Sequence, residues 1–317
     1  MAETQVPTLD ARDFLSGDAS RKARFVADLL RAYTDIGFVV VRGHAVSEDL
    51  QKRAYSVIGD FFHLPTERKR TYEVHGTGGA RGYTSFGKEH AKDSKHGDLK
   101  EFFHVGMEVP KDHALAGQYP PNVLVPDVPH FDTTLRLLYS GLLDLGIEML
   151  RAIALGLELP ENYFDEKVRH GNSILRPIHY PAMTGKEEPG AVRSGAHEDI
   201  NLITLLIGAS SPGLEVKNKR GDWVSIVTEP HEIVVNVGDM PQRLTNHRLK
   251  STTHRVVNPP PAAKNPTRYS IPFFLHPVSD MSLAALPSCM KAGETPREPP
   301  ILAGDYLEQR LREIGLL

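Results

Sequence analysis

The 317-residue sequence predicts a mainly β protein with flanking helices, whose β core follows an N-terminal α/β region. Two observations carry this prediction. The second half is a series of short strand-like segments, separated by turn residues such as Pro212-Gly213 and Gly238-Asp239. The first half reads as helices around a few short strands. Many short strands at near-regular spacing are typical of a sandwich or a closed barrel rather than of βαβ units.

The N-terminal region begins with a clear strand and helix. Residues 38–41 form an apolar, β-branched run bounded by Gly37 and Gly43, which predicts a buried strand. Ser47 is expected to cap a helix that runs through Phe62 and ends before Pro65. The chain therefore alternates strand and helix near its N-terminus.

The middle of the chain predicts two irregular segments and one long helix. Residues 76–88 form a glycine-rich loop, and residues 110–129 contain five prolines. Leucines recur at helical spacing over 133–157, which predicts a long amphipathic helix. A last helix is expected at 306–311.

The second half predicts eight strands. Their ranges are 173–180, 193–197, 201–208, 213–217, 222–227, 232–237, 252–257 and 268–275. No internal repeat or low-complexity linker interrupts the chain. We therefore expect one integrated unit, made of an N-terminal mixed region (1–130) and a β core with the last helix (131–317).

Composition excludes several classes of protein. A formal net charge of -3 without a basic block argues against nucleic-acid binding. Cys289 is the only cysteine, which excludes an internal disulfide and a cysteine-based metal site. The polar, acidic N-terminus lacks the pattern of a secretory signal, and no apolar run is long enough to cross a bilayer. We expect a cytoplasmic protein and, without a coiled-coil pattern, a monomer.

His197 and Asp199 are the first candidates for chemistry. Residues i and i+2 of a strand share one face, so these two side chains converge while Glu198 turns away. An imidazole and a carboxylate two residues apart, completed by a histidine from a distant strand, describe the facial triad of non-haem iron(II) enzymes. An H-x-D pattern alone is common by chance, so the prediction depends on the third ligand.

Two histidines could supply this third ligand. His247 lies in a polar stretch that is predicted to be a loop, whereas His254 opens a predicted strand. A metal ligand needs a rigid support, so His254 is the preferred candidate. For His247 we expect a solvated loop position.

Arg268 and Ser270 share one face of the last predicted strand. A guanidinium and a hydroxyl at the end of a pocket suit the distal carboxylate of a keto-diacid, to which arginine can bond bidentately. Taken alone, this pair of residues is better explained as a surface arginine beside a serine of the β-barrel.

Together these segments resemble the isopenicillin-N-synthase-like branch of the iron(II)/2-oxoglutarate oxygenases. The resemblance rests on residues 197–206 (HEDINLITLL), 244–256 (LTNHRLKSTTHRV) and 268–274 (RYSIPFF), with further matches at 35–44, 81–83 and 99–103. It implies a double-stranded β-helix (jelly-roll) core. It also implies an iron(II) centre held by His197, Asp199 and His254, with 2-oxoglutarate as co-substrate and O2 as oxidant.

The resemblance implies further site residues. Arg268 and Ser270 match the clamp for the far carboxylate of 2-oxoglutarate, and Tyr180 falls where many members place a tyrosine that contacts it. Arg81 and Tyr83 are candidates for the substrate pocket, because the matching part of the family contributes substrate contacts. The implied reaction is hydroxylation, desaturation or cyclisation of a small organic molecule.

Alternative functions stay open at this point. An isopenicillin-N-synthase-like oxidase would use iron and oxygen without 2-oxoglutarate. A non-catalytic jelly-roll binding protein would hold no working iron, and a hydrolytic zinc enzyme would not account for Arg268 and Ser270. Glu101 and His104 could form a second metal pair, although a role on a helix face or in a loop is expected for them.

Overall fold

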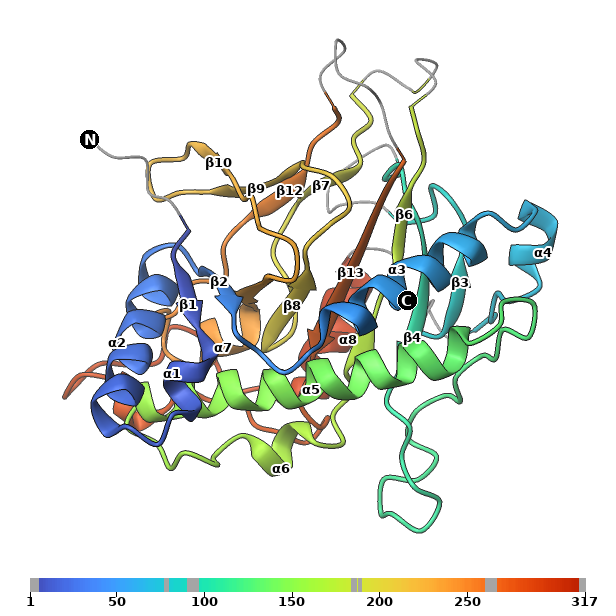
Figure 1. Ribbon diagram of the computed structural model, residues 1–317. Coiled ribbons are helices and arrows are strands. Elements are labelled where there is room, and N and C mark those ends of the chain that lie inside the picture. The colour runs from blue at the N-terminus through green and yellow to red at the C-terminus, as the bar shows by residue number, and fades with distance from the viewer. Residues whose placement is uncertain are drawn as a thin grey trace.

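The computed structural model describes residues 6–76, 80–89, 97–183, 187, 190–259 and 267–313. Two β-sheets form its core (Figure 1). The strands of the larger sheet are, in order across it, β1 (Thr8–Asp10), β2 (Phe38–Arg42), β11 (Ile233–Val237), β8 (Ile203–Ile207), β13 (Arg268–Leu275), β5 (Ile174–Leu175), β4 (Glu101–Gly106) and β3 (Gly82–Thr84). Strand β6 (Ile178–Tyr180) pairs with both β13 and β4.

The smaller sheet covers one face of the larger one. Its strands are, in order, β10 (Trp223–Ser225), β9 (Leu214–Lys217), β12 (His254–Val256) and β7 (Ser194–His197). The fold class predicted from the sequence, a mainly β jelly roll with flanking helices, is confirmed. Among the described residues, no helix is both long and apolar enough to cross a membrane.

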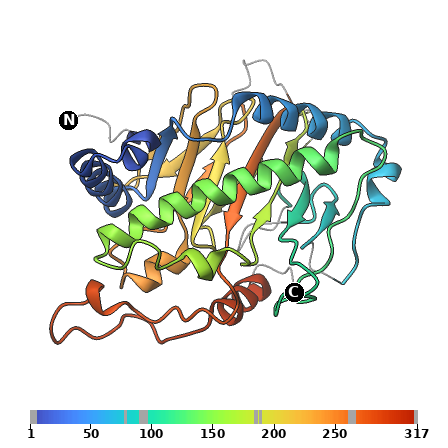
Figure 2. The same ribbon diagram turned by 60° about the horizontal axis from the view of Figure 1, so that its bottom comes forward.

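Helices pack around the two sheets. They are α1 (Ala11–Leu15), α2 (Ala19–Asp35), α3 (Glu48–Phe62), α4 (Thr66–Arg70), α5 (Phe131–Gly156), α6 (Asp165–Val168), α7 (Asp239–Leu244), the 3-10 helix η1 (Pro287–Cys289) and α8 (Ala303–Glu313). Figure 2 shows α5 running across the strands, with α2 and α3 packed beside it. Helix α5 buries its leucine stripe against β4, β8 and β13.

The elements predicted with the strongest patterns are present. The helix expected over 133–157 is α5, and the Ser47 hydroxyl accepts a hydrogen bond from the Leu50 amide at 3.2 Å to cap α3. The proline-rich stretch 110–129 contains neither helix nor strand. All eight predicted strand segments contain a strand, although 173–180 divides into β5 and β6 at Pro177, which has no amide hydrogen to donate.

Three strands of the N-terminal half were not predicted correctly. Strand β1 pairs in parallel with β2, and β3 lies inside the predicted loop 76–88. Strand β4 carries Glu101 and His104, for which a helix-face or loop position was expected, and every residue of this strand is buried. The charged and polar residues of β4 interrupt the apolar run that normally reveals a buried strand.

The N-terminal region contributes directly to the core. Strand β2 pairs antiparallel with β11, so residues from both sides of the predicted boundary at 130 share one sheet. That boundary stays a prediction.

Two glycines give a matched test of the packing around β4. A Cβ at Gly106 would lie 1.9 Å from Cζ of the buried Arg81, whereas a Cβ at Gly59 in α3 would meet nothing within 4 Å. We expect Gly106→Ala to lower the free energy of unfolding by at least about 1–3 kcal/mol, because the guanidinium must move. Gly59→Ala should raise it by roughly 0.5–1 kcal/mol through helix propensity. Urea denaturation measures both, and equal stabilities would contradict this packing.

Candidate metal centre and active site

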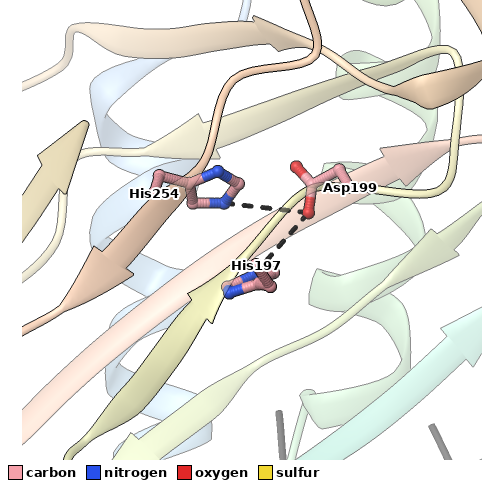
Figure 3. A group of neighbouring side chains, drawn as sticks. All are labelled: His197, Asp199 and His254. Atoms are coloured by element: carbon pink, nitrogen blue, oxygen red, sulfur yellow. Dashed lines mark ion pairs between the residues drawn. The ribbon is translucent and has the colours of Figure 1, made fainter. Parts of the chain in front are cut away.

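Three side chains converge between the two sheets. His197 ends β7, Asp199 follows it by two residues, and the pairing of β7 with β12 places His254 directly opposite His197. Figure 3 shows the three pointing toward one another. The Nε2 atoms of His197 and His254 lie 3.9 and 3.8 Å from Oδ1 of Asp199, and all three candidate ligand atoms lie within 4.8 Å of one another. Two imidazole nitrogens and one carboxylate oxygen are the donor set of a non-haem iron(II) site.

Backbone carbonyls orient both imidazoles. Nδ1 of His197 donates to the Gly195 carbonyl at 2.8 Å, and Nδ1 of His254 donates to the Thr252 carbonyl at 3.1 Å. Because Nδ1 carries the proton in both rings, the lone pair of each Nε2 faces the common point.

The Asp199 carboxylate is oriented in the same way. Its Oδ2 accepts hydrogen bonds from the Thr204 hydroxyl at 2.6 Å and from the Asn236 amide at 2.8 Å, which leaves Oδ1 for a metal. Sequence reasoning missed both donors. The available signal was that each is the one polar residue of an otherwise apolar strand, Thr204 in β8 and Asn236 in β11.

The electrostatics of the site favour the metal-binding protonation states. Burial opposes ionisation of Asp199, but the two histidines and the two hydrogen bonds outweigh it and hold the pKa of this carboxyl below its ordinary value. Burial and the nearby His254 hold the pKa of His197 below its ordinary value. An ionised carboxylate and neutral imidazoles are the forms that bind a metal.

The other candidate for the third ligand lies elsewhere. His247 adopts a positive φ of 68°, and its Nε2 lies 2.6 Å from Oε1 of Glu298. Within the described ranges, the side chains of His197, Asp199 and His254 are the only group of three that could hold a metal ion. Glu101 contacts Lys69, Tyr83 and His179 instead.

Arg268, Ser270 and Tyr180 meet at the pairing of β13 with β6. Arg268 lies opposite Tyr180, with its Cζ 4.9 Å from the centre of the tyrosine ring. The side chain is 1% exposed, and its Nε donates to the Ser211 carbonyl at 3.1 Å. Its Nη1 is buried and has no hydrogen-bond partner among the described residues. An unpaired buried guanidinium nitrogen is costly, and a bound carboxylate would satisfy it.

One cavity of about 590 Å³ joins these groups. Its lining includes the predicted residues His197, Asp199, His254, Arg268, Ser270, Tyr180 and Tyr83. Arg81 is not among the lining residues: it is fully buried against Gly106. The structure therefore brings together seven of the eight predicted site residues and places Arg81 apart from them.

Two family profiles match the chain. Residues 6–127 match the N-terminal region described as non-haem dioxygenase in morphine synthesis, and residues 171–277 match the 2OG-Fe(II) oxygenase superfamily. A 2-oxoglutarate-Fe(II) type oxidoreductase of Emericella nidulans is 33% identical, over 97% of this chain and 89% of that relative. The chain belongs to the 2OG-Fe(II) oxygenase superfamily.

Solved structures of this superfamily share the whole fold. A protein of Caulobacter crescentus assigned to the 2OG-Fe(II) oxygenase family is 40% identical, with a TM-score of 0.86 over 99% of this chain and 100% of that one. A full-length protein of Neurospora crassa, solved in complex with alpha-KG (2-oxoglutarate), is 32% identical, with a TM-score of 0.87 over 98% of both chains. The chain is thus a dioxygenase enzyme, and structures that contain 2-oxoglutarate favour this activity over an oxidase that does not use it.

The Thr204 hydroxyl offers a test of the carboxylate orientation. We expect Thr204→Val, which keeps the shape but loses the donor, to weaken Fe(II) binding by about 10- to 100-fold, as loss of an outer partner commonly does. Thr204→Ser should retain most of the affinity because it keeps the hydroxyl. Anaerobic competition with a coloured Fe(II) chelator measures both. Wild-type affinity in Thr204→Val would contradict the assigned role.

Proposed function

We propose that this enzyme uses iron(II) and 2-oxoglutarate to hydroxylate, desaturate or cyclise a small organic substrate. In this proposal His197, Asp199 and His254 hold the iron, and Arg268, Ser270 and Tyr180 hold the far carboxylate of 2-oxoglutarate. One observation carries it: the three candidate metal ligands line the same cavity as Arg268, whose buried Nη1 has no hydrogen-bond partner among the described residues.

The protein groups bind and orient the reactants. His197, Asp199 and His254 would hold the iron through two imidazole nitrogens and one carboxylate oxygen, and these three ligands would leave coordination sites for co-substrate and oxygen. When bound, iron and 2-oxoglutarate supply the oxidising power, since decarboxylation of the keto acid is coupled to reduction of O2. Arg268 fixes the keto acid through charge-assisted hydrogen bonds, and apolar lining residues such as Leu206 and Phe274 limit water near the reacting atoms.

Relatives support a small-molecule substrate. The Neurospora crassa protein has also been solved with alpha-KG and thymine together, at 32% identity and a TM-score of 0.86 over 98% of both chains. A proline hydroxylase of Petromyces alliaceus is 32% identical over 97% of this chain and 98% of that relative. We further infer a monomeric, cytoplasmic enzyme that does not bind nucleic acid, in keeping with its formal net charge of -3.

The two neighbouring histidines provide a matched test of the metal site. We expect His254→Gln to weaken Fe(II) binding by more than about 100-fold, because a direct ligand is lost. His247→Gln should leave the affinity unchanged, since His247 contacts Glu298 rather than the triad. Anaerobic calorimetry with Fe(II) measures both variants. Similar Fe(II) affinities for the two variants would show that His254 is not a metal ligand.

Arg268 allows a separate test of the co-substrate site. Arg268→Gln should raise the KM for 2-oxoglutarate by about 10- to 100-fold, because a charge-assisted hydrogen bond contributes ~1.5–3 kcal/mol. Ser270→Ala should have a smaller effect, and Fe(II) binding should not change in either. Succinate formation measures the KM. A wild-type KM in Arg268→Gln would show that the carboxylate binds elsewhere.

A further inference from the structure

Four charged side chains form one wall of the cavity that also contains the triad. We call Glu89, Asp98, Lys100 and Arg176 the charged wall. Nζ of Lys100 lies 2.8 Å from Oε1 of Glu89 and 2.7 Å from Oδ2 of Asp98. Nη1 of Arg176 lies 3.2 Å from both carboxylate oxygens of Glu89. The wall is thus a continuous chain of alternating charges.

The charges of this wall neutralise one another away from water. The side chains of Asp98 and Lys100 are each 6% exposed, and those of Glu89 and Arg176 are 12% and 18% exposed. Burial disfavours the Glu89 carboxylate, yet Arg176 and Lys100 hold its pKa below the ordinary value. Two cations therefore face two carboxylates, and the wall has no net charge.

Other charges of the lining are mostly paired as well. Glu73 and Lys88 lie 3.0 Å apart, and Arg310 is paired with Glu313 at 2.7 Å. Glu198 accepts a hydrogen bond from the Thr253 hydroxyl.

Arg268 and Asp199 complete the charges of the lining. Among the described residues, Arg268 has no carboxylate partner, and the two histidines are the only titratable groups that pair with Asp199. These two side chains are the ones proposed to bind 2-oxoglutarate and iron. The rest of the cavity is therefore lined by the charged wall, whose charges already neutralise one another. A charged substrate would find no free counter-charge there, and burying an uncompensated charge is costly.

Arg176 is held rigidly and still has a free donor edge. Its Cζ lies 4.5 Å from the centre of the Phe102 ring and 5.0 Å from that of Phe274. Its Nε donates to Nε2 of His104 at 2.5 Å, and Nη1 is bonded to Glu89. Nη2 has no hydrogen bond to any residue in the described part of the chain. The wall thus places a cationic N–H donor beside a carboxylate acceptor.

This donor and acceptor pair matches one chemical group. In such a group a carbonyl oxygen accepts a hydrogen bond from Arg176, and the adjacent N–H donates one to the Glu89 carboxylate. A carboxylate would instead be repelled by Glu89, and an ammonium would be repelled by Arg176. We propose that the charged wall selects neutral substrates that carry adjacent carbonyl and N–H groups, as in an amide, a lactam or an imide. The inference rests on the proposed function, because it places the substrate beside the iron and 2-oxoglutarate.

Three probes of one shape and different charge test this selection. Benzamide, benzoate and benzamidinium are titrated anaerobically into the enzyme loaded with Fe(II) and 2-oxoglutarate, with calorimetry as the readout. The wild type should bind benzamide at least about tenfold more tightly than either ion. Glu89→Gln leaves an excess positive charge and should shift the preference to benzoate. Arg176→Gln leaves an excess negative charge and should shift it to benzamidinium.

Glu73→Gln is the matched control. It removes a carboxylate from the same cavity, but its partner Lys88 is 54% exposed and solvent screens the change, so benzamide should stay preferred. A wild type that prefers either ion or does not bind benzamide would overturn the inference, as would an unchanged preference in Glu89→Gln. The visible band of the Fe(II)–2-oxoglutarate complex is recorded for each protein. Absence of this band from the wild type would overturn the proposed function. A normal band together with a preference for benzoate or benzamidinium would overturn only the proposed selection of neutral substrates by the charged wall.

Discussion

The site depends on the antiparallel pairing of β7 with β12, which places His197 directly opposite His254. A slip of one residue in this pairing would turn one imidazole to the other face of the smaller sheet and separate the two rings. The chain then leaves β7, and the amide of Asp239 donates to the Asp199 carbonyl at 2.7 Å, which fixes the third ligand. The larger sheet supplies Thr204 and Asn236 to the same carboxylate, so the metal site needs both sheets.

The other elements build the cavity around this metal site. Helix α5 packs on the outer face of the larger sheet and holds β8 and β13 in place. Strand β13 in turn presents Arg268 beside Tyr180 at the proposed co-substrate end of the cavity. The N-terminal half supplies Glu89, Asp98 and Lys100 to a different wall. In the proposed function, metal and co-substrate binding thus belong to the jelly roll, whereas the proposed substrate side is built largely from the preceding region.

Local rules explain why some features were predictable from the sequence. The rule that residues two apart share a face predicts the convergence of His197 and Asp199, although β7 ends at His197 and Asp199 lies just beyond it. The need for a rigid support distinguishes His254 from His247. By contrast, β4 was missed because a buried strand with Glu101 and His104 is stable only when distant groups, such as Lys69 and Arg176, neutralise or bond them.

Local sequence patterns do not predict which distant residues pair with buried polar groups. The pairing of Glu89 with Arg176 joins residues far apart in the chain and depends on tertiary contacts. Arg81 shows the same limit, since its motif suggested the pocket but its side chain packs against Gly106.

The most direct measurement is an anaerobic titration of the metal-free enzyme with Fe(II) and then with 2-oxoglutarate, followed by visible absorption. Chelation of the keto acid by iron in this site should produce a saturable metal-to-ligand charge-transfer band with one equivalent of each. Iron binding without the band would contradict the co-substrate site, and a failure to bind iron would contradict the metal centre itself.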